Sequence, residues 1–132
     1  MNGEKPMFYN NTVKKLTARF YRNTHQIDRV IKAKHFIDQN FNQPLSLDTI
    51  SNAVHVSKFH LNREFKRLYG LTPAQHLKEK RISEAKKILA NHGSVSDACY
   101  SVGYESLSTF SLLFRRMTGK NAAKVKSARM NK

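Results

Sequence analysis

Apolar residues recur at three- and four-residue intervals along most of the chain, and polar residues fill the positions between them. That period places the apolar residues on one face of a helix, whereas a half-buried strand alternates apolar and polar residues. Alternation of the second kind, bounded by turn residues, does not occur. The pattern therefore predicts an all-α fold.

The beginning of the chain carries two helical patterns of unequal strength. Residues 11–22 predict a short basic helix with Val13, Leu16 and Phe20 on one side. Because so short a helix is marginal alone, a linker is the alternative. Residues 25–40 predict a stronger amphipathic helix. Its apolar side is expected to include Ile27, Val30, Ile31 and residues 37–41.

Residues 46–70 predict a short helix, a tight turn and a longer helix. Ser46 and Ser57 are expected to cap the two helices, because a serine hydroxyl accepts a hydrogen bond from an unpaired backbone N–H at a helix start. Gly70 is expected to end the longer helix, since glycine readily takes the left-handed conformation that closes helices. The core face of the longer helix is predicted to carry Leu61, Phe65 and Leu68.

A second unit of the same kind occupies about residues 94–119. Ser94 and Asp97 form the pattern of a capping box at the start of its short helix. The sequence at the end of the longer helix, FRRMTG, parallels FKRLYG in the first unit, and each ends in glycine. Phe110, Leu113 and Phe114 are expected on its core face. The chain thus contains helix-turn-helix twice.

A basic helix at about residues 72–91 joins the two units, with Thr72 as its expected cap and Pro73 at its first position. From Pro73 to Asn91 such a helix is roughly 28 Å long at ~1.5 Å per residue. Successive major grooves on one side of DNA lie about 34 Å apart. One rigid connection could therefore place two helices in adjacent grooves without a dimer.

In a helix-turn-helix the second helix enters the major groove, and its N-terminal half meets the base edges. With Leu61 and Phe65 in the core, polar and aromatic side chains face outward in the first unit. Arginine suits guanine, asparagine suits adenine, and an aromatic ring can pack on a thymine methyl group. The outward residues are Lys58, Phe59, Asn62, Arg63 and Lys66. The alternative interpretation is an ordinary solvated helix face.

The formal net charge of +15 and the sequence pI of about 10.3 favour polyanionic partners, with nucleic acid first and an anionic membrane surface second. Cys99 is the only cysteine, so a disulfide framework is excluded and a reducing cytoplasm fits. No apolar run approaches the ~20 residues of a membrane-spanning helix. We expect a soluble, cytoplasmic protein that is nucleoid-associated when bound to DNA.

Residues 45–126 resemble the DNA-binding domain of the AraC/XylS family of bacterial transcription regulators. The resemblance is carried by SLDTISNAVHVSKFHLNREFKRLYGLTPAQHLKEKRISEAKKILAN and by SVSDACYSVGYESLSTFSLLFRRMTG. Its anchors are Ser57, Leu61, Phe65, Lys66, Gly70, Arg81, Ala85, Leu89, Gly103, Tyr104, Phe110, Phe114 and Gly119. The resemblance implies two helix-turn-helix subdomains bridged by a linker helix.

The resemblance also implies which residues meet DNA. The base contacts it implies come from Phe59, Asn62, Arg63, Leu107, Ser108, Thr109, Ser111 and Leu112. Contacts to the DNA backbone are expected from Ser57, Lys58, Lys66, Arg67, Arg115 and Arg116. Double-stranded DNA is the expected partner, together with RNA polymerase if the protein is an activator.

Several positions depart from the family pattern. Ser51 and Cys99 replace the usual alanines, and His55 replaces a turn glycine, which histidine can tolerate better than most residues. Leu107 and Leu112 stand where the family often has glutamine or arginine. Reading in the second groove should therefore depend more on shape, methyl contacts and phosphate.

The expected organisation is a basic N-terminal segment at residues 1–24, a DNA-binding domain at residues 25–126 and a basic tail at residues 127–132. The segment before the domain is too short for a separate sensor domain. The protein is therefore a short stand-alone regulator or the DNA-binding part of a larger one.

Other chemistries have little support in the sequence. The six histidines lack metal-ligand spacing, and the nine acidic residues form no paired-carboxylate site, so we expect no metal, no cofactor and no enzyme activity. One alternative is a cationic module that binds RNA or anionic membranes through charge alone. Another is an interaction domain that docks partners through Phe8, Phe20 and Tyr21.

Overall fold

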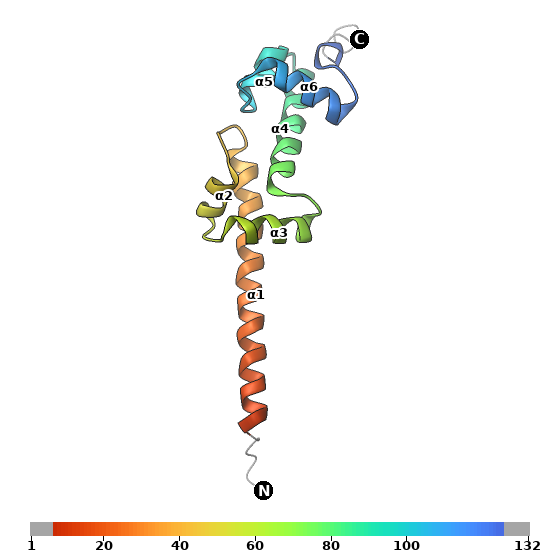
Figure 1. The fold of residues 1–132 in the computed structure, drawn as a ribbon. Coiled ribbons are helices and arrows are strands. Elements are labelled where there is room, and N and C mark those ends of the chain that lie inside the picture. Colours follow the sequence, from red (N-terminus) through yellow and green to blue (C-terminus); the bar gives the residue numbers. More distant parts are fainter. Residues whose placement is uncertain (1–6, 126–132) are drawn as a thin grey trace.

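The computed structural model describes the backbone of residues 7–125, and this part of the chain contains helices and no strands. The helices are α1 (Met7–Asn40), α2 (Leu47–Ala53), α3 (Lys58–Tyr69), α4 (Pro73–Ala90), α5 (Val95–Ser101) and α6 (Leu107–Thr118). A further helical turn covers residues 122–125. The predicted all-α fold with two helix-turn-helix units and a linking helix is confirmed. Figure 1 shows the two units at opposite ends of α4. The tail at residues 127–132 lies outside the described residues, as do the side chains of Phe8 and Tyr21 of the predicted docking surface.

The predicted capping residues hold the helix ends. The Ser57 hydroxyl accepts a hydrogen bond from the backbone N–H of His60 at 3.1 Å, and Ser46 does the same for α2. Ser94 and Asp97 form the reciprocal capping box of α5. Thr72 and its partner Gln75 form a second capping box, at the start of α4. Because these bonds depend on short sequence patterns, the helix starts were predictable without knowledge of the fold.

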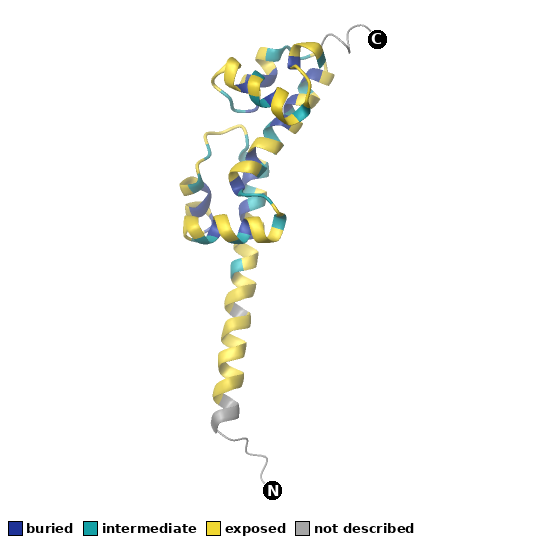
Figure 2. Ribbon diagram, turned by 45° about the vertical axis from the view of Figure 1, so that its right-hand side comes forward, coloured by how far each residue is buried: buried dark blue, intermediate teal, exposed yellow. Residues whose placement is uncertain are grey.

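The two helical segments expected before residue 40 are one helix. α1 runs without interruption through Arg22 and Thr24, so the alternative prediction of a linker before the second helical segment is wrong. Only its second half packs on other helices, and residues 11–20 are all exposed (Figure 2). Ile27 and Ile31 were expected on the buried side, but 47% and 38% of their surfaces are exposed.

Two hydrophobic clusters form the core, one for each unit. The first contains Val30, Ala33, Ile37, Ile50, Val54, Leu61, Phe65 and Leu77. The second contains Ile82, Ala85, Leu89, Ala98, Cys99, Val102, Phe110, Phe114 and Ala122. Helix α4 therefore contributes its beginning to the first cluster and its later turns to the second. The prediction that Leu68 joins the core is wrong, because 46% of its surface is exposed near the end of α3.

Arg81 of α4 connects the two units. Its Nε donates a hydrogen bond to the carbonyl oxygen of Phe41 at 2.7 Å, and its Nη2 donates to that of Gln43 at 2.9 Å. Both carbonyls belong to the loop between α1 and α2. The same guanidinium group lies over the ring of Tyr104 in the second unit, 5.0 Å from the ring centroid. Phe41 itself packs against both hydrophobic clusters.

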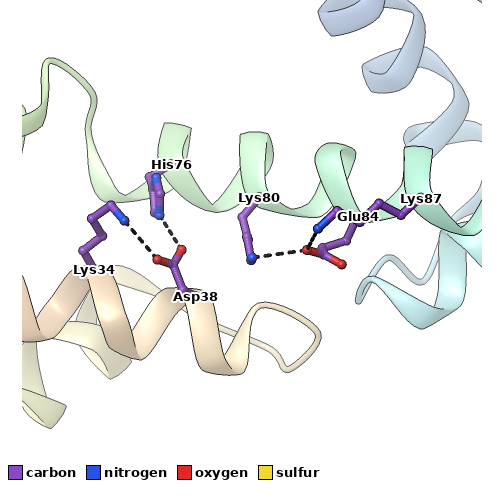
Figure 3. Close-up of polar contacts among 6 residues, drawn as sticks. All are labelled: Lys34, Asp38, His76, Lys80, Glu84 and Lys87. Carbon is purple, nitrogen blue, oxygen red and sulfur yellow. Dashed lines mark hydrogen bonds and ion pairs between the residues drawn. The ribbon is translucent and has the colours of Figure 1, made fainter.

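A polar cluster between α1 and α4 supports the same junction. Asp38 accepts hydrogen bonds from His76 Nε2 at 2.7 Å and from Lys34 Nζ at 3.1 Å (Figure 3). Partial burial would raise the pKa of the Asp38 carboxyl group, but the bonds and charges of His76 and Lys34 outweigh it and hold the pKa below its ordinary value. The charged form of Asp38 therefore stabilises the fold.

The turns of the two units each place a residue with positive φ at the same position, but with different angles and different residues. His55 and Gly103 each follow the C-cap of the short helix, and both have positive φ, 59° and 102°. The first angle lies in the left-handed region that histidine can occupy, but the second does not. A Cβ atom at Gly103 would also lie 3.1 Å from Arg81 Nη2 and 3.1 Å from the carbonyl oxygen of Phe41. The histidine is thus tolerated in the first turn, whereas the second requires glycine.

We expect Asp38→Asn to lower the free energy of unfolding at neutral pH by about 1–2 kcal/mol, because it removes the charged acceptor of two hydrogen bonds. The folded-state pKa of Asp38 is lowered, so its contribution is present above the unfolded-state pKa and is lost as the pH falls through the folded-state pKa. The difference between the two proteins in urea unfolding should therefore shrink towards acid pH. The exposed Asp28→Asn is the control, and an equal effect there would contradict the assignment.

Gly103→Ala should lower the free energy of unfolding by about 2–3 kcal/mol, because it adds backbone strain and a close contact with the Arg81 junction. His55→Gly at the equivalent turn should change it by less than about 1 kcal/mol, since relief of strain and added chain entropy oppose each other. Thermal or urea unfolding of the two variants measures the contrast. Equal effects would show that the two turns have the same requirement.

Candidate nucleic-acid interface

The outward face of α3 is formed by polar and aromatic side chains, because Leu61 and Phe65 turn into the core with no exposed surface. Phe59 has 76% of its surface exposed, an unusual value for a phenylalanine. The ammonium group of Lys58 lies 5.6 Å from the centroid of the Phe59 ring. Asn62, Arg63, Lys66 and Arg67 are exposed along the same helix. The structure thus brings the residues predicted on α3 together on its solvent side.

Three of the cations of α3 form weak ion pairs. Arg63 Nε lies 3.4 Å from Glu64 Oε1, and Arg67 Nη1 lies 3.6 Å from Glu64 Oε2. Lys58 Nζ lies 3.7 Å from Asp48 Oδ1 on α2. The side chains of Arg63 and Arg67 are 71% and 80% exposed, so these pairs contribute little to stability. An anion arriving at the surface can therefore replace the carboxylates at small cost.

Helix α6 presents a different surface at the corresponding positions. Leu107 and Leu112 are 38% and 53% exposed, where α3 has Lys58 and Arg63. The side chains of Ser108, Thr109 and Ser111 lie between them with hydroxyl groups, and Ser111 is half-buried. Ser108 Oγ is 3.0 Å from Oγ of the helix cap Ser106. The N-terminal half of α6 thus offers methyl groups and hydroxyls but no charge.

Both helices end in cations. Lys66 and Arg67 occupy the last turn of α3, and Arg115 and Arg116 occupy the last turn of α6, all exposed. Cations are favourable at this end of a helix because the backbone dipole is negative there. They can also contact phosphate groups flanking a groove. The structure adds the exposed lysines of α4 between the two units, Lys78, Lys86 and Lys87.

A metal site, a reactive cysteine and a membrane span were each checked against the described residues. No group of three or more histidine, cysteine, aspartate or glutamate side chains could hold a metal ion there. Cys99 is fully buried, and this burial raises the pKa of its thiol, so the reactive thiolate is disfavoured. None of the described helices is both long enough and apolar enough to cross a bilayer.

The fold and the two exposed helix faces agree with comparisons to known proteins. A family model described as a helix-turn-helix domain matches residues 50–128, more than half of the chain. The chain belongs to the AraC/XylS family of transcription regulators.

Among curated relatives, this family member is 30% identical over 90 residues to the bifunctional transcriptional activator and DNA repair enzyme AdaA of Bacillus subtilis. That match covers 67% of the chain but 43% of AdaA. The chain spans about half the length of the first curated relatives it matches.

The fold recurs in solved structures, and two of them serve as examples. The C-terminal domain of AraT, a response regulator from Geobacillus stearothermophilus, matches with a TM-score of 0.73 and 24% identity, covering 76% of this chain and 85% of that one. The DNA-binding domain of AdpA, solved in complex with a target DNA, matches with a TM-score of 0.72 and 21% identity, covering 77% of this chain and 93% of that one.

The acidic residues that pair with cations of α3 in this AraC/XylS member were not predicted from the sequence. Glu64 pairs with both Arg63 and Arg67, and only the second pair has the i,i+3 spacing that marks neighbours on a helix. The pair between Asp48 and Lys58 joins two helices, so it had no local signal.

Proposed function

We propose that the protein is a transcription regulator that binds double-stranded DNA in a sequence-specific way. In this proposal α3 and α6 enter successive major grooves. The observation that carries it is the placement of two capped helices with exposed N-terminal faces at opposite ends of one helix, α4 (Figure 1). The AraC/XylS fold, which this chain shares with a domain solved on its target DNA, supports the same function.

The dimensions of α4 support two contacts by a single chain. Its 18 residues correspond to about 27 Å at ~1.5 Å per residue. The spacing of major grooves on one side of DNA is about 34 Å, and the two units extend beyond the ends of α4. The Arg81 junction restrains their relative orientation, which reduces the entropy lost when both helices bind.

We assign different roles to the two helices because their surfaces differ. Asn62 and Arg63 carry hydrogen-bonding groups suited to adenine and guanine, and Phe59 can contact a thymine methyl group. In the second groove, Leu107 and Leu112 would contact methyl groups, while Ser108, Thr109 and Ser111 supply hydroxyls. The arginines and lysines at the helix ends would hold phosphates. RNA polymerase is a further partner in this proposal if the regulator is an activator. The proposed location of the protein is the bacterial cytoplasm.

The proposal is tested by selecting bound duplexes from a random DNA pool and measuring the affinity at increasing salt. We expect two sub-sites about one helical turn apart, with stronger sequence preference in the one bound by α3. The affinity should fall steeply with salt, because neutralising several phosphates releases counterions. Binding without sequence preference, or equally to single-stranded RNA, would instead support a cationic module that recognises charge alone.

Arg63→Ala should weaken binding to the selected duplex by about 1–3 kcal/mol and relax the preference at one base pair, because a bidentate contact to guanine is lost. Leu112→Ala should weaken binding less, since it removes only apolar contact. Gel-shift titrations on the selected duplex and on single-base variants measure both effects. Arg67→Ala is the matched control and should weaken binding to all sequences alike. Uniform loss for Arg63→Ala would reassign that residue to a phosphate contact.

A further inference from the structure

The N-terminal half of α1 carries a row of residues that its own fold leaves unused. We call Val13, Leu16, Phe20, Asn23 and Ile27 the seam. Its four apolar members are between 42% and 71% exposed, and Phe20 is the most exposed of them. This stretch of α1 extends away from the rest of the molecule (Figure 2). A solitary helix with such a row is marginally stable in water, so burial of the seam by another helix would stabilise this part of α1.

The spacing of the seam is that of a coiled coil. Its members follow one another at alternating intervals of three and four residues, which is the a and d pattern of a heptad repeat. Asn23 occupies a d position of this pattern. Its amide can both donate and accept a hydrogen bond, so burial on this face favours a register in which it meets a polar partner. The spacing therefore indicates packing against another helix along this face.

The residues that flank the seam suit an interface as well. Between Leu16 and Ile27 the flanking positions hold Thr17, Arg19, Thr24 and Gln26. The hydroxyl of Thr17 donates to the carbonyl oxygen of Val13 at 2.8 Å, and that of Thr24 donates to Phe20 at 2.9 Å. Because these donors are satisfied within α1, the threonines can border an apolar contact without an unmet hydrogen bond.

The charge distribution indicates what the partner is. Lys14, Lys15 and Arg22 lie on α1 away from the seam, and three of the four flanking residues are uncharged. An acidic partner helix would be matched by cations beside the seam. A second copy of this chain, which has a net charge of +15, would instead require the cations to lie away from the seam, because like charges repel each other. The seam therefore fits a second copy of this chain.

We propose that α1 pairs with α1 of a second copy as a parallel, in-register coiled coil along the seam. In this arrangement each Asn23 amide faces its own counterpart and can form a hydrogen bond with it, whereas an antiparallel pair using the whole seam would place it against an apolar side chain. At the C-terminal end of the seam, Asn23 and Ile27 line a groove with Leu68 of α3, and the ion-paired Glu64 and Arg67 of α3 line the same groove. The partner helix would reach this groove and cover Leu68.

The test is the molar mass of the full chain without DNA, measured by sedimentation equilibrium across a range of concentrations. We expect self-association to twice the chain mass of 15.2 kDa. Leu16→Lys and Phe20→Lys should abolish it, while leaving the helix-turn-helix units folded by circular dichroism. Ala18→Lys adds the same charge to the exposed face away from the seam and should leave the dimer intact. A monomer at all concentrations, or a dimer that survives Leu16→Lys, would overturn the proposal.

Salt distinguishes the apolar seam from an ionic contact. Raising the salt concentration should strengthen the dimer, because it screens the repulsion between two strongly cationic chains without weakening apolar contact. Weakening by salt would contradict the seam as the source of association.

Orientation is tested by disulfide formation in Val13→Cys and, separately, in Ile27→Cys. In a parallel in-register pair both positions face themselves, so each variant should form a covalent dimer under mild oxidation. The native Cys99 is buried and provides the background rate. Cross-linking of neither variant, or of only one of them, would overturn the parallel arrangement.

Discussion

The relation between the two helix-turn-helix units depends on the guanidinium group of Arg81. Each unit has its own hydrophobic cluster, and of the described residues Phe41 packs against both. Arg81 binds two carbonyl oxygens of the first unit while lying on the ring of Tyr104 in the second. Directed bonds to fixed acceptors define an angle, which non-directional apolar contact does not. The close approach of Gly103 leaves the space that this side chain needs.

Much of the fold could be predicted because its signals are local. Ser57, Thr72 and Ser94 cap helices through bonds to residues three positions away, and Gly70 and Gly119 end helices through their own backbone angles. The continuity of α1 and the exposure of Leu68 could not be read in this way. Periodicity identifies which residues share a helix face, but whether another element covers that face is decided by tertiary packing.

In the candidate interface, too, features with a local sequence signal could be predicted and features set by tertiary packing could not. The outward direction of Asn62 and Arg63 followed from the core positions beside them, because the helical period fixes both faces together. The exposed apolar residues of α6 were also anticipated from spacing. The pairing of Lys58 with Asp48 was not, since two separate helices bring these charges together.

The length of α4 has a consequence for how such a protein can vary. One residue added between Leu77 and Leu89 would turn everything after it by about 100° around the helix axis and move it by about 1.5 Å. The shift along the axis is small, but the rotation would aim α6 at a different side of the duplex. Point substitutions on the solvent side of α4 are therefore tolerable, while insertions and deletions are not. The number of residues in α4 is therefore constrained by the rotation that it gives to α6 more than by the length of the helix.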